Sequence, residues 1–543
     1  MTRRLRPYGD RAVLVELDHL DDVIDLREGL EASRPHGIVD IVPAASTITV
    51  TFEPTAVPAE AVRAWITDAR PLPASTSRTE TVTIDVDYSG DDLAEVARIL
   101  NVSVDEVIRL HTQSQWRVAF GGFAPGFGYL ITDHDRLVVP RRQSPRTSVP
   151  AGSVALAGEF SGVYPRSGPG GWQLIGTTDA TLFDPARDPA VLLRPGVDVR
   201  FRAVGASRAQ ASSAGSPSTA EPGPMPRGAA PDASAAPDAS AAPAEPDASA
   251  GLRIVEPGPL TLIEDLGRAG NAAIGAARSG ALDRGALRLA NRLVGNSEDD
   301  AALEIMVGGF SATIERPLWF AITGALAPAT LDGRPIEPDE ATHAEAGQTL
   351  RIGLAQRGLR SYLAVRGGVV ASAVLGSRSR DVLAEIGPGP LVTGDVVEIG
   401  PAPSHPIPSV DTMTVSPPMD GTVTIRVLPG PREHWFTDAA LEHFYDAEWV
   451  VTAQGNRTGI RLDPASDAAA AGTPLERAVA GELPSEAMVA GAIQVPPAGQ
   501  PTVLLADHPT TGGYPVIAVV TDAALDAFAQ LRPGQRVAFR HAR

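Results

Sequence analysis

The chain of 543 residues contains no cysteine and no lysine, so all 46 of its basic residues are arginine. Without cysteine it forms no disulfide and offers no thiolate nucleophile or cysteine ligand for zinc. Without lysine it has no Walker A phosphate lysine, no amine for a Schiff base and no attachment point for biotin. It also lacks the lysine base of the serine–serine–lysine amidases. The chain by itself therefore performs none of these chemistries.

Long apolar runs and basic patches are absent as well. No stretch of about 18 apolar residues occurs, so we expect no membrane-spanning segment, and the basic start lacks the apolar core of a secretory signal. The net charge of −19 argues against a nucleic-acid partner. The ten histidines show no zinc-binding spacing, and no nucleophile elbow or dinucleotide fingerprint occurs. We predict a cytoplasmic protein and assign no structural metal site.

Glycine and proline are abundant, with 53 and 49 residues, which favours short strands joined by turns over long helices. Residues 206–250 contain no aromatic residue and no isoleucine, leucine or valine, and they repeat a Pro-Asp-Ala-Ser-Ala unit. Such a segment cannot bury enough apolar surface to offset its ordering entropy. We therefore predict a linker between two halves that fold separately.

The first half is predicted to hold a small α/β lobe (1–78) and a barrel (79–205). In the lobe, alternating strands are expected at Arg11–Leu17 and Ser46–Phe52, and helices at Leu20–Ser33 and Pro58–Ala69. The barrel region opens with a strand at Glu80–Tyr88 and helices at Asp91–Leu100 and Ser103–His111. A capping box, Ser103 with Glu106, begins the second of these helices. Short strands and Gly/Pro turns follow, as in a barrel or sandwich.

The second half (251–543) shows the same pattern of short strands and Gly/Pro turns, with helices expected at Leu282–Val294 and near Asp438–Tyr445. A turn glycine followed by an amphipathic strand occurs four times in the chain. The copies are Arg194–Phe201, Glu345–Ile352, Val392–Ile399 and Leu531–Phe539. Because two of them close the two halves, they indicate related β modules.

The first chemistry-bearing segment is His111–Leu130. Its aromatic-flanked glycines surround a proline in a predicted loop of Gly122, Phe123, Pro125 and Gly126. Glycine there permits positive φ or close approach of a ligand to the backbone. His111 is a candidate acid/base or anion-binding group.

The second segment runs from Pro140 to Gly176. Arginine side chains suit carboxylate or phosphate, and a glycine loop leads directly into a tryptophan. The alternative is a solvated loop beside a core tryptophan. As a set we favour an anion site, with candidates Arg141, Arg146, Ser153, Tyr164 and Trp172.

The third segment, Glu482–Val520, places polar groups among strands. Asp507 follows a buried-looking strand, where a carboxylate is a candidate general base or Mg²⁺ ligand. The alternative is a turn aspartate that holds its own backbone. The further candidates in this segment are Glu486, Gln494, Thr510, Thr511, Gly512, Gly513 and Tyr514.

These segments carry a family resemblance. The first half, with RVAFGGFAPGFGYL and PRRQSPRTSVPAGSVALAG, resembles the B subunit of 5-oxoprolinase, also grouped with a kinase inhibitor and allophanate hydrolase subunit 1. The second half, with SGALDRGALRLANRLVGN, VLGSRSRDVL and GAIQVPPAGQPTVLLADHPTTGGYP, resembles the C subunit of the same enzyme, grouped with the inhibitor's antagonist and allophanate hydrolase subunit 2. The resemblance covers the whole chain except the linker. Its motifs add Arg268, Ser279, Asp283 and Arg378 as candidate substrate- or phosphate-binding residues.

The resemblance implies a mainly β protein with α+β elements. A cyclophilin-like barrel would follow the small lobe, and a related pair of cyclophilin-like β domains would form the second half, in contact with the first. The implied activity is ATP-dependent opening of 5-oxoproline to glutamate, which needs the separate A subunit of that enzyme. ATP with Mg²⁺, bound here or mainly at that partner, is the implied cofactor. Asp507 or Glu486 would act as base, and Arg146, Arg268 or Arg378 would hold carboxylate or phosphate.

Two other functions stay open. The same paired domains resemble part of urea carboxylase, so the chain could be an accessory protein of urea or allophanate metabolism, with biotin on another chain. It could instead be a non-enzymatic regulator of a histidine kinase. Departures from the family pattern of the second half, such as GAARSGALD at 275–283, leave the substrate undecided.

Overall fold

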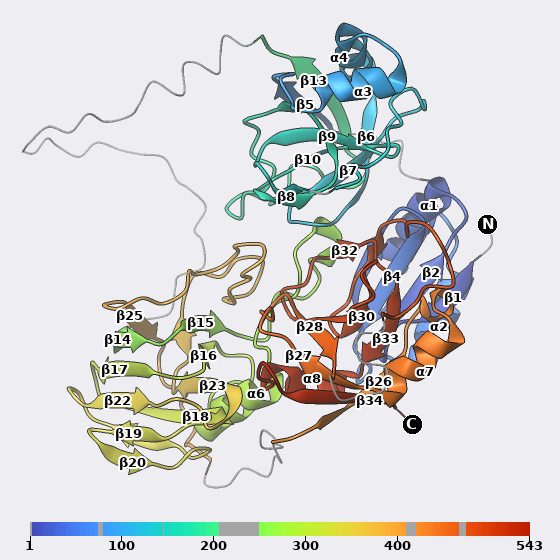
Figure 1. The fold of residues 1–543 in the computed structure, drawn as a ribbon. Coiled ribbons are helices and arrows are strands. Elements are labelled where there is room, and N and C mark those ends of the chain that lie inside the picture. The colour runs from blue at the N-terminus through green and yellow to red at the C-terminus, as the bar shows by residue number, and fades with distance from the viewer. Residues whose placement is uncertain are drawn as a thin grey trace, which may run out of the picture.

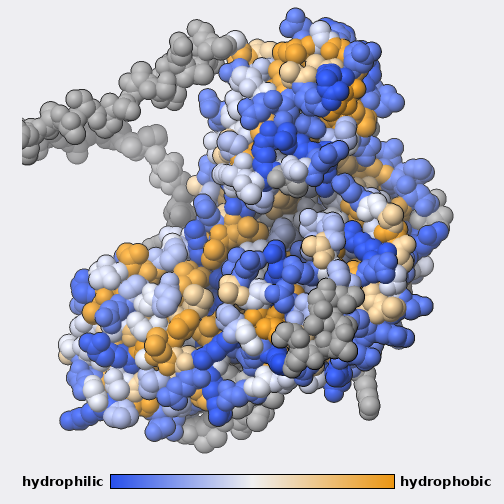
Figure 2. All heavy atoms as spheres, viewed as in Figure 1, coloured by the Kyte–Doolittle hydropathy of each residue, from blue (hydrophilic) through white to orange (hydrophobic). Residues whose placement is uncertain are grey.

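The computed structural model describes residues 3–73, 80–144, 146–205, 249–408, 420–465 and 474–542, and the fold is mainly β, as predicted. The predicted linker lies outside the described residues, except for its last two, which begin strand β14. Hydrophilic and hydrophobic residues are interspersed over the visible face of the molecule (Figure 2). No helix within the described ranges is long and apolar enough to cross a membrane.

The small N-terminal lobe is a four-stranded antiparallel sheet with two helices, in the strand order β1-β2-β4-β3. Its elements are β1 (Arg4–Pro7), β2 (Ala12–Glu16), α1 (Leu20–Ala32), β3 (Ile38–Pro43), β4 (Thr47–Phe52) and α2 (Ala59–Asp68). The two predicted strands and two predicted helices are all present. The apolar faces of α1 and α2 pack on one side of the sheet, for example through Leu26 and Ile66, both fully buried.

A barrel-like sheet of seven strands follows, in the order β12-β9-β10-β7-β6-β13-β5. Its strands are β5 (Thr81–Val86), β6 (Trp116–Gly121), β7 (Gly128–Ile131), β9 (Ser153–Ala157), β10 (Phe160–Val163), β12 (Gln173–Thr177) and β13 (Asp198–Ala203). A bridge between Asp87 and Thr177 joins its two edges, so the barrel is nearly closed. The predicted helices are α3 (Leu93–Leu100) and α4 (Val104–Gln113). The Glu106 amide donates to Ser103 Oγ at 3.1 Å, which is the serine half of the predicted capping box, while the Glu106 carboxylate accepts from Arg109 and Arg136 instead.

The C-terminal barrel is closed and has the same strand order, β33-β30-β31-β28-β27-β34-β26. Its elements are β26 (Val423–Pro429), η2 (Glu433–Trp435), α7 (Asp438–Asp446), β27 (Glu448–Val451), β28 (Gly459–Pro464), β30 (Ala492–Gln494), β31 (Thr502–Leu504), β33 (Val516–Val520), α8 (Asp522–Ala529) and β34 (Arg536–His541). In both barrels the last strand pairs in parallel with the first strand. In both, a tryptophan indole donates to the carbonyl five residues earlier, Trp116 to His111 at 2.9 Å and Trp449 to Phe444 at 3.1 Å. The two barrels are therefore related modules.

The middle domain (249–408) stacks a seven-stranded and a five-stranded sheet. The first sheet holds β14 (Ser249–Pro257), β17 (Phe310–Ile314), β19 (Ala329–Leu331), β20 (Arg334–Ile336), β22 (Thr349–Ile352), β24 (Val369–Val370) and β25 (Val396–Ile399). The second holds β15 (Leu260–Glu264), β16 (Ala302–Met306), β18 (Leu318–Leu326), β21 (Thr342–Ala344) and β23 (Arg357–Val365). Between β15 and β16 lie η1 (Ala272–Ile274) and α6 (Arg284–Leu293), which packs on β18 and β23.

The four predicted turn–strand units are confirmed. Gly196, Gly347, Gly394 and Gly534 have φ of +89°, +88°, +95° and +86°, and the strands β13, β22, β25 and β34 follow them. Only glycine adopts this backbone region without strain. The repeated glycine therefore marks a repeated turn.

The two halves are docked on each other, as Figure 1 shows: the N-terminal lobe lies against the C-terminal barrel, near β30 and β33. Tyr8 and Leu14 of the lobe share one buried apolar cluster with Met488 and Val519 of that barrel. The amide of Ala45 donates to the carbonyl of Ser485 at 3.3 Å. The halves thus share a core.

Candidate ligand site between the two related barrels

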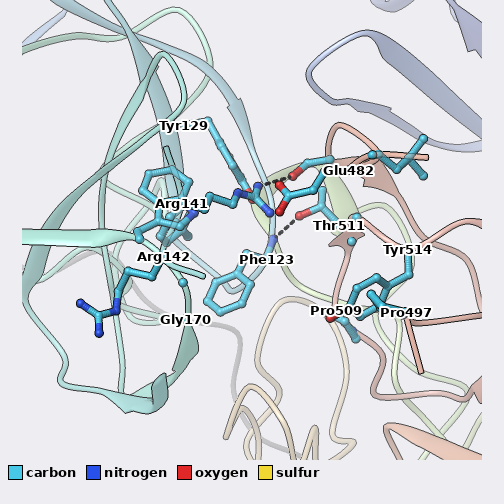
Figure 3. Close-up of a pocket in the computed structure, with 18 of the residues that line it drawn as sticks. Phe123, Tyr129, Arg141, Arg142, Gly170, Glu482, Pro497, Pro509, Thr511 and Tyr514 are labelled. Carbon is cyan, nitrogen blue, oxygen red and sulfur yellow. Dashed lines mark hydrogen bonds between the residues drawn. The ribbon is translucent and has the colours of Figure 1, made fainter. Parts of the chain in front are cut away.

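A cleft of about 460 Å³ lies where the two related barrels face each other. Both halves of the chain line it, and so do parts of all three chemistry-bearing segments (Figure 3). From the first half come Phe123, Phe127, Tyr129, Arg141, Arg142, Gln143, Tyr164, Gly170, Gly171 and Trp172. From the second half come Arg477, Gly481, Glu482, Leu483, Ser485, Pro497, Pro509, Thr511, Gly512, Gly513 and Tyr514.

Corresponding loops of the two barrels build opposite walls of the cleft. In the first barrel, β8 (Arg146–Val149) pairs with β11 (Gly168–Gly170), and a Gly-Gly-Trp run leads into β12. In the C-terminal barrel, β29 (Glu486–Ala487) pairs with β32 (Thr511–Gly512), and a Gly-Gly-Tyr run leads into β33. The cleft is thus formed by equivalent loops of two related modules, each with a two-stranded pair and a Gly-Gly-aromatic run.

The glycine-rich loop after β6 joins the two halves beside the cleft. The Phe123 amide donates to Thr511 Oγ1 at 2.8 Å, and Phe123 itself has φ +64°. A Cβ at Gly122 would lie 2.4 Å from Thr511 Cγ2, so only glycine fits there. The amide of Gly126 donates to the carbonyl of Ile274 at 3.2 Å. The predicted loop of Gly122, Phe123, Pro125 and Gly126 therefore binds the other half of the chain.

Aromatic rings form one wall of the cleft. Phe127 contacts Tyr129, Tyr164 and Trp172 edge to face, with ring centroids 5.1, 5.4 and 5.3 Å apart. Burial raises the pKa of the Tyr164 hydroxyl, which therefore keeps its proton at neutral pH. This wall is apolar and offers a hydroxyl donor to a bound molecule.

Charged side chains line the cleft on both sides. Arg141 reaches from the first barrel toward Glu482 and Thr511 (Figure 3), and its guanidinium donates to Ser485 Oγ at 3.3 Å. Arg477 lies on the opposite side, where its guanidinium donates to the carbonyl of Val495 at 2.6 Å. Since Arg141 has no ion pair among the described residues, it is free to bind a carboxylate.

The other predicted arginine of this region, Arg146, is already paired. Its guanidinium bonds to Asp92 at 2.9 Å, and Arg142 bonds to the same carboxylate at 2.5 Å. Although burial opposes ionisation, hydrogen bonds from Arg146 and the Leu174 amide hold the pKa of Asp92 below its usual value. Arg146 therefore supports the cleft wall and does not line the cleft.

His111 lies in the core of the first barrel and is fully buried. Nδ1 shares a hydrogen bond with the Tyr88 hydroxyl at 2.7 Å and Nε2 with Ser161 Oγ at 2.9 Å, while the ring contacts that of Phe201 in a tilted arrangement. Burial lowers the pKa of His111 to about 3, so the imidazole is neutral. The structure places this candidate acid/base group away from the cleft.

The buried histidine makes the first barrel acid-sensitive. Between about pH 6.5 and 3 the unfolded chain protonates this residue and the folded chain does not, so stability falls as pH falls. This one group contributes about 1.4 kcal/mol per pH unit in that range. We expect His111→Gln to be less stable than the wild type at pH 7, with a smaller difference at pH 5. Thermal unfolding at both pH values measures this, and an equal difference at both would contradict it.

Asp507 lies in a buried charged network centred on Arg457, not in the cleft. Arg457 Nε bonds to Asp507 Oδ2 at 2.9 Å and Arg457 Nη1 to Glu304 Oε1 at 2.7 Å. Asp507 also accepts from Ser279 Oγ at 2.6 Å and from the Val382 amide at 3.0 Å. Because its oxygens are already occupied, Asp507 is suited to fixing the turn that leads to Pro509 and Thr511.

The candidates from the middle domain surround the same network. Asp265 accepts from the Arg378 amide at 2.6 Å and from Ser379 Oγ at 2.5 Å, and Arg268 donates to the carbonyl of Ser379. Asp283 caps α6, since its Oδ1 accepts from the Ala286 amide at 2.9 Å, and burial raises its pKa to about 7. The structure places Arg268, Ser279, Asp283 and Arg378 together around one domain junction and outside the cleft.

Glu486 joins the N-terminal lobe to the C-terminal barrel. The buried guanidinium of Arg432 bonds to both Glu486 and Glu16 of the lobe. Burial raises the pKa of Glu486 despite this partner. Gln494 lies in β30, Ser153 is buried in β9, and Thr510 is buried beside β32. These four candidates also lie outside the cleft.

Comparisons with known proteins also divide the chain into a first and a second half. A family model described as carboxyltransferase domain, subdomain C and D, matches residues 3–193, and one described as subdomain A and B matches 274–541. The second half is 39% identical over 291 residues to the C subunit of 5-oxoprolinase from Escherichia coli, covering 53% of this chain and 90% of the relative. The first half is 43% identical over 168 residues to the B subunit of the enzyme from Escherichia coli O157:H7, covering 30% and 77%. The chain belongs to the family of the B and C subunits of 5-oxoprolinase.

Two further comparisons match this chain to different extents. The crystal structure of TTHA0988 superposes with a TM-score of 0.79 at 33% identity, covering 98% of this chain and 99% of that chain. The urea amidolyase of Saccharomyces cerevisiae is 31% identical over 307 residues, or 16% of its own length. A B-type half and a C-type half in one polypeptide is therefore the arrangement of this chain.

Several cleft residues of this family member were not predicted from the sequence. Glu482, Ser485 and Arg477 line the cleft, and so do Phe127 and Tyr129. Phe127 and Tyr129 lie inside the first chemistry-bearing segment, and Glu482 begins the third. Their positions within these segments could therefore have indicated that they line the site. Arg477 follows a stretch without periodic pattern, and no feature of the sequence pointed to it.

Proposed function

We propose that the chain is the B–C component of an ATP-dependent 5-oxoprolinase, which opens 5-oxo-L-proline to L-glutamate together with the separate A subunit of that enzyme. One observation carries the proposal: the cleft is built jointly by the B-type and C-type halves. Relatives of both halves are named as subunits of one enzyme, 5-oxoprolinase. A joint site would require both halves for activity.

The cleft suits a small lactam that carries a carboxylate. Arg141 would bind the carboxylate in a charge-assisted pair, and the Tyr164 hydroxyl would donate to the lactam carbonyl. The planar ring would lie against Phe127 and Trp172. In hydrolysis the C–N bond breaks, water adds its oxygen to the carbonyl carbon, and the nitrogen takes a proton. Glu482, the carboxylate that lines the cleft in the described part of the chain, would move that proton.

Two features of the chain favour a nucleotide site on another protein. The chain has no lysine, and among the described residues no group of three or more His, Asp or Glu side chains is arranged to hold a metal ion. We therefore propose that the nucleotide binds mainly on the A subunit, and no step on this chain runs through it.

Reconstitution tests the proposed function. The purified chain is combined with a relative of the A subunit, Mg-ATP and 5-oxoproline, and glutamate and phosphate are measured, with urea in a parallel reaction. We expect glutamate and phosphate to form together only when both proteins and 5-oxoproline are present. Turnover of ATP with urea but not with 5-oxoproline, or no turnover at all, would overturn the proposal.

The second candidate function is an accessory role in urea carboxylase-type metabolism. It is favoured by the carboxyltransferase family models and by the similarity to urea amidolyase. Biotin would then lie on another chain, because this one has no lysine to carry it. The urea arm of the reconstitution, repeated with a biotin-dependent carboxylase in place of the A subunit, distinguishes this candidate.

Arg141 is expected to set the affinity for the carboxylated substrate. A lost charge-assisted hydrogen bond costs about 1.5–3 kcal/mol, so Arg141→Ala should lower kcat/KM by about ten- to a hundredfold, mainly through KM. The matched control is Arg136→Ala, an exposed arginine paired with Glu106. Steady-state kinetics of the reconstituted enzyme measure both variants. Equal effects of the two substitutions would remove Arg141 from substrate binding.

A further inference from the structure

A second, smaller pocket lies where three parts of the chain meet. It has a volume of about 160 Å³, close to the roughly 150 Å³ of a protein cavity that admits benzene. The N-terminal lobe, the β15–α6 connection and the C-terminal barrel all line it. We call it the junction pocket. Its lining includes Arg11, Asp40, Phe52, Glu53, Ala277, Arg278, Arg284, Met488, His508, Val519, Asp522 and Leu525.

Two of the three arginines of the junction pocket are already neutralised. Arg11 bonds to Glu53 at 2.9 Å and to Asp522 at 2.5 Å. Arg284 bonds to Asp522 at 2.7 Å and to Asp526 at 3.2 Å. These ion pairs balance the positive charge of both arginines. Through Asp522, Arg11 holds the lobe and Arg284 holds the middle domain against the C-terminal barrel.

The third arginine, Arg278, has no carboxylate partner among the described residues. Its Nε donates to the carbonyl of Leu266 at 3.0 Å, and no acceptor within the described chain takes its two terminal nitrogens. Burial lowers the pKa of Arg278, and the neighbouring Arg284 and Arg11 add to this effect, while Asp522 and Glu53 oppose it. A guanidinium in such surroundings is stabilised by an anion.

The junction pocket also contains a carboxylate, that of Asp40, which lies in the field of Arg34 and Arg278. Asp40 is 9% exposed, and its two oxygens accept from the Ala272 amide at 3.0 Å and the Gly270 amide at 3.3 Å. It forms no ion pair with any residue that the structure describes. Burial raises the pKa of Asp40 to about 6, despite the two amides. A bound cation would restore the ionised form.

Apolar side chains form another part of the lining of the junction pocket. Phe52 and Met488 line the junction pocket from the lobe and the barrel, and Val519 and Ala277 complete its apolar part. All four are buried. A ligand here would bury an apolar body while its charged ends meet Arg278 and Asp40.

We propose that the junction pocket binds a free α-amino acid, with its carboxylate on Arg278 and its ammonium on Asp40. The ligand would give an ion-pair partner to each of these two groups, neither of which has one among the described residues, and a short or apolar side chain fits the volume and the apolar lining. This site is separate from the cleft, and it does not depend on the proposed ring-opening activity. The lactam 5-oxoproline lacks the ammonium, so it is not the preferred ligand here.

Calorimetric titration of the full purified chain tests the site with L-alanine, L-leucine and L-glutamate. We expect at least one to bind with a dissociation constant below about 1 mM. N-acetylation or amidation of the bound amino acid should each weaken binding at least about tenfold, because each removes one charged end. Arg278→Met and Asp40→Asn should do the same, whereas Arg141→Ala in the cleft should leave binding unchanged. The modified ligands decide the question even where a variant does not fold.

No binding of any of the three amino acids up to 10 mM (about tenfold above the expected constant) would overturn the proposal. Equal binding of the modified ligands would also overturn it. A separate titration with 5-oxoproline tests the cleft. If Arg141→Ala abolishes that binding and Arg278→Met does not, the binding takes place in the cleft and not in the junction pocket. The two proposals therefore fail or succeed independently.

Discussion

Replacing Arg457 with alanine is expected to destabilise the second half by about 3–5 kcal/mol. Arg457 is 3% exposed and touches three carboxylates, on Asp507, Glu304 and Glu264. Without the guanidinium these carboxylates remain buried and lose their main counter-charge, so they must be protonated or solvated for the fold to persist. Chemical denaturation monitored by circular dichroism measures the loss.

The matched control for Arg457 is Arg461→Ala, four residues away, where an exposed guanidinium bonds to Gln454 at 2.8 Å. Surface substitutions of this kind usually change stability by less than about 0.5 kcal/mol. The difference in stability between Arg457→Ala and the wild type should also be smaller at low pH, because the unpaired carboxylates would then be protonated in both the folded and the unfolded state. Equal stabilities of the two variants would show that the network does not hold the domain junction together.

Replacing Arg432 with methionine is expected to have an effect of similar size, about 3–5 kcal/mol, for the same reason. Here Glu486 of the C-terminal barrel loses its ion-pair partner, and Glu16 of the N-terminal lobe keeps only Arg6, at 2.9 Å. Because this ion cluster spans the two halves, its loss should loosen their docking as well as lower stability. Cleavage in the linker followed by size-exclusion chromatography measures whether the halves still elute together.

The double variant Arg432→Met with Glu486→Gln provides the matched test. Removing both charges should recover part of the lost stability, because a neutral pair is less costly to bury than a lone carboxylate. Additive losses in the double variant would contradict an ion-pair role for Arg432. So would cleaved halves that stay associated in the single variant as firmly as in the wild type.

Local patterns predicted much of the fold. Ser103 caps α4 as expected, and the turn glycines Gly196 and Gly534 precede the strands that close the two barrels. These features depend on residues a few positions apart. The shared strand order of the barrels was visible in the sequence only as the repeated turn–strand unit, since pairing between distant strands leaves no local pattern.

The candidate site was predicted only in part, because contacts between residues far apart in the sequence leave no local pattern. Arg141, Trp172 and Thr511 line one cleft because corresponding loops of two related barrels face each other. Asp507 and Arg146 looked equally suitable in the sequence. Their partners, Arg457 and Asp92, lie 50 and 54 residues away, so the ion pairs that occupy them could not be foreseen. A charged residue near a glycine loop indicates a site only after its long-range partners are known.

The most direct test of the cleft as the substrate site is the binding of 5-oxoproline to the purified chain alone, with no other protein present. Calorimetric titration compares the wild type with Arg141→Ala and with Arg136→Ala. We expect 5-oxoproline to bind the wild type and Arg136→Ala equally and to bind Arg141→Ala at least about tenfold more weakly. Equal affinity of all three proteins, or no binding to the wild type, would contradict a substrate site between the two related barrels.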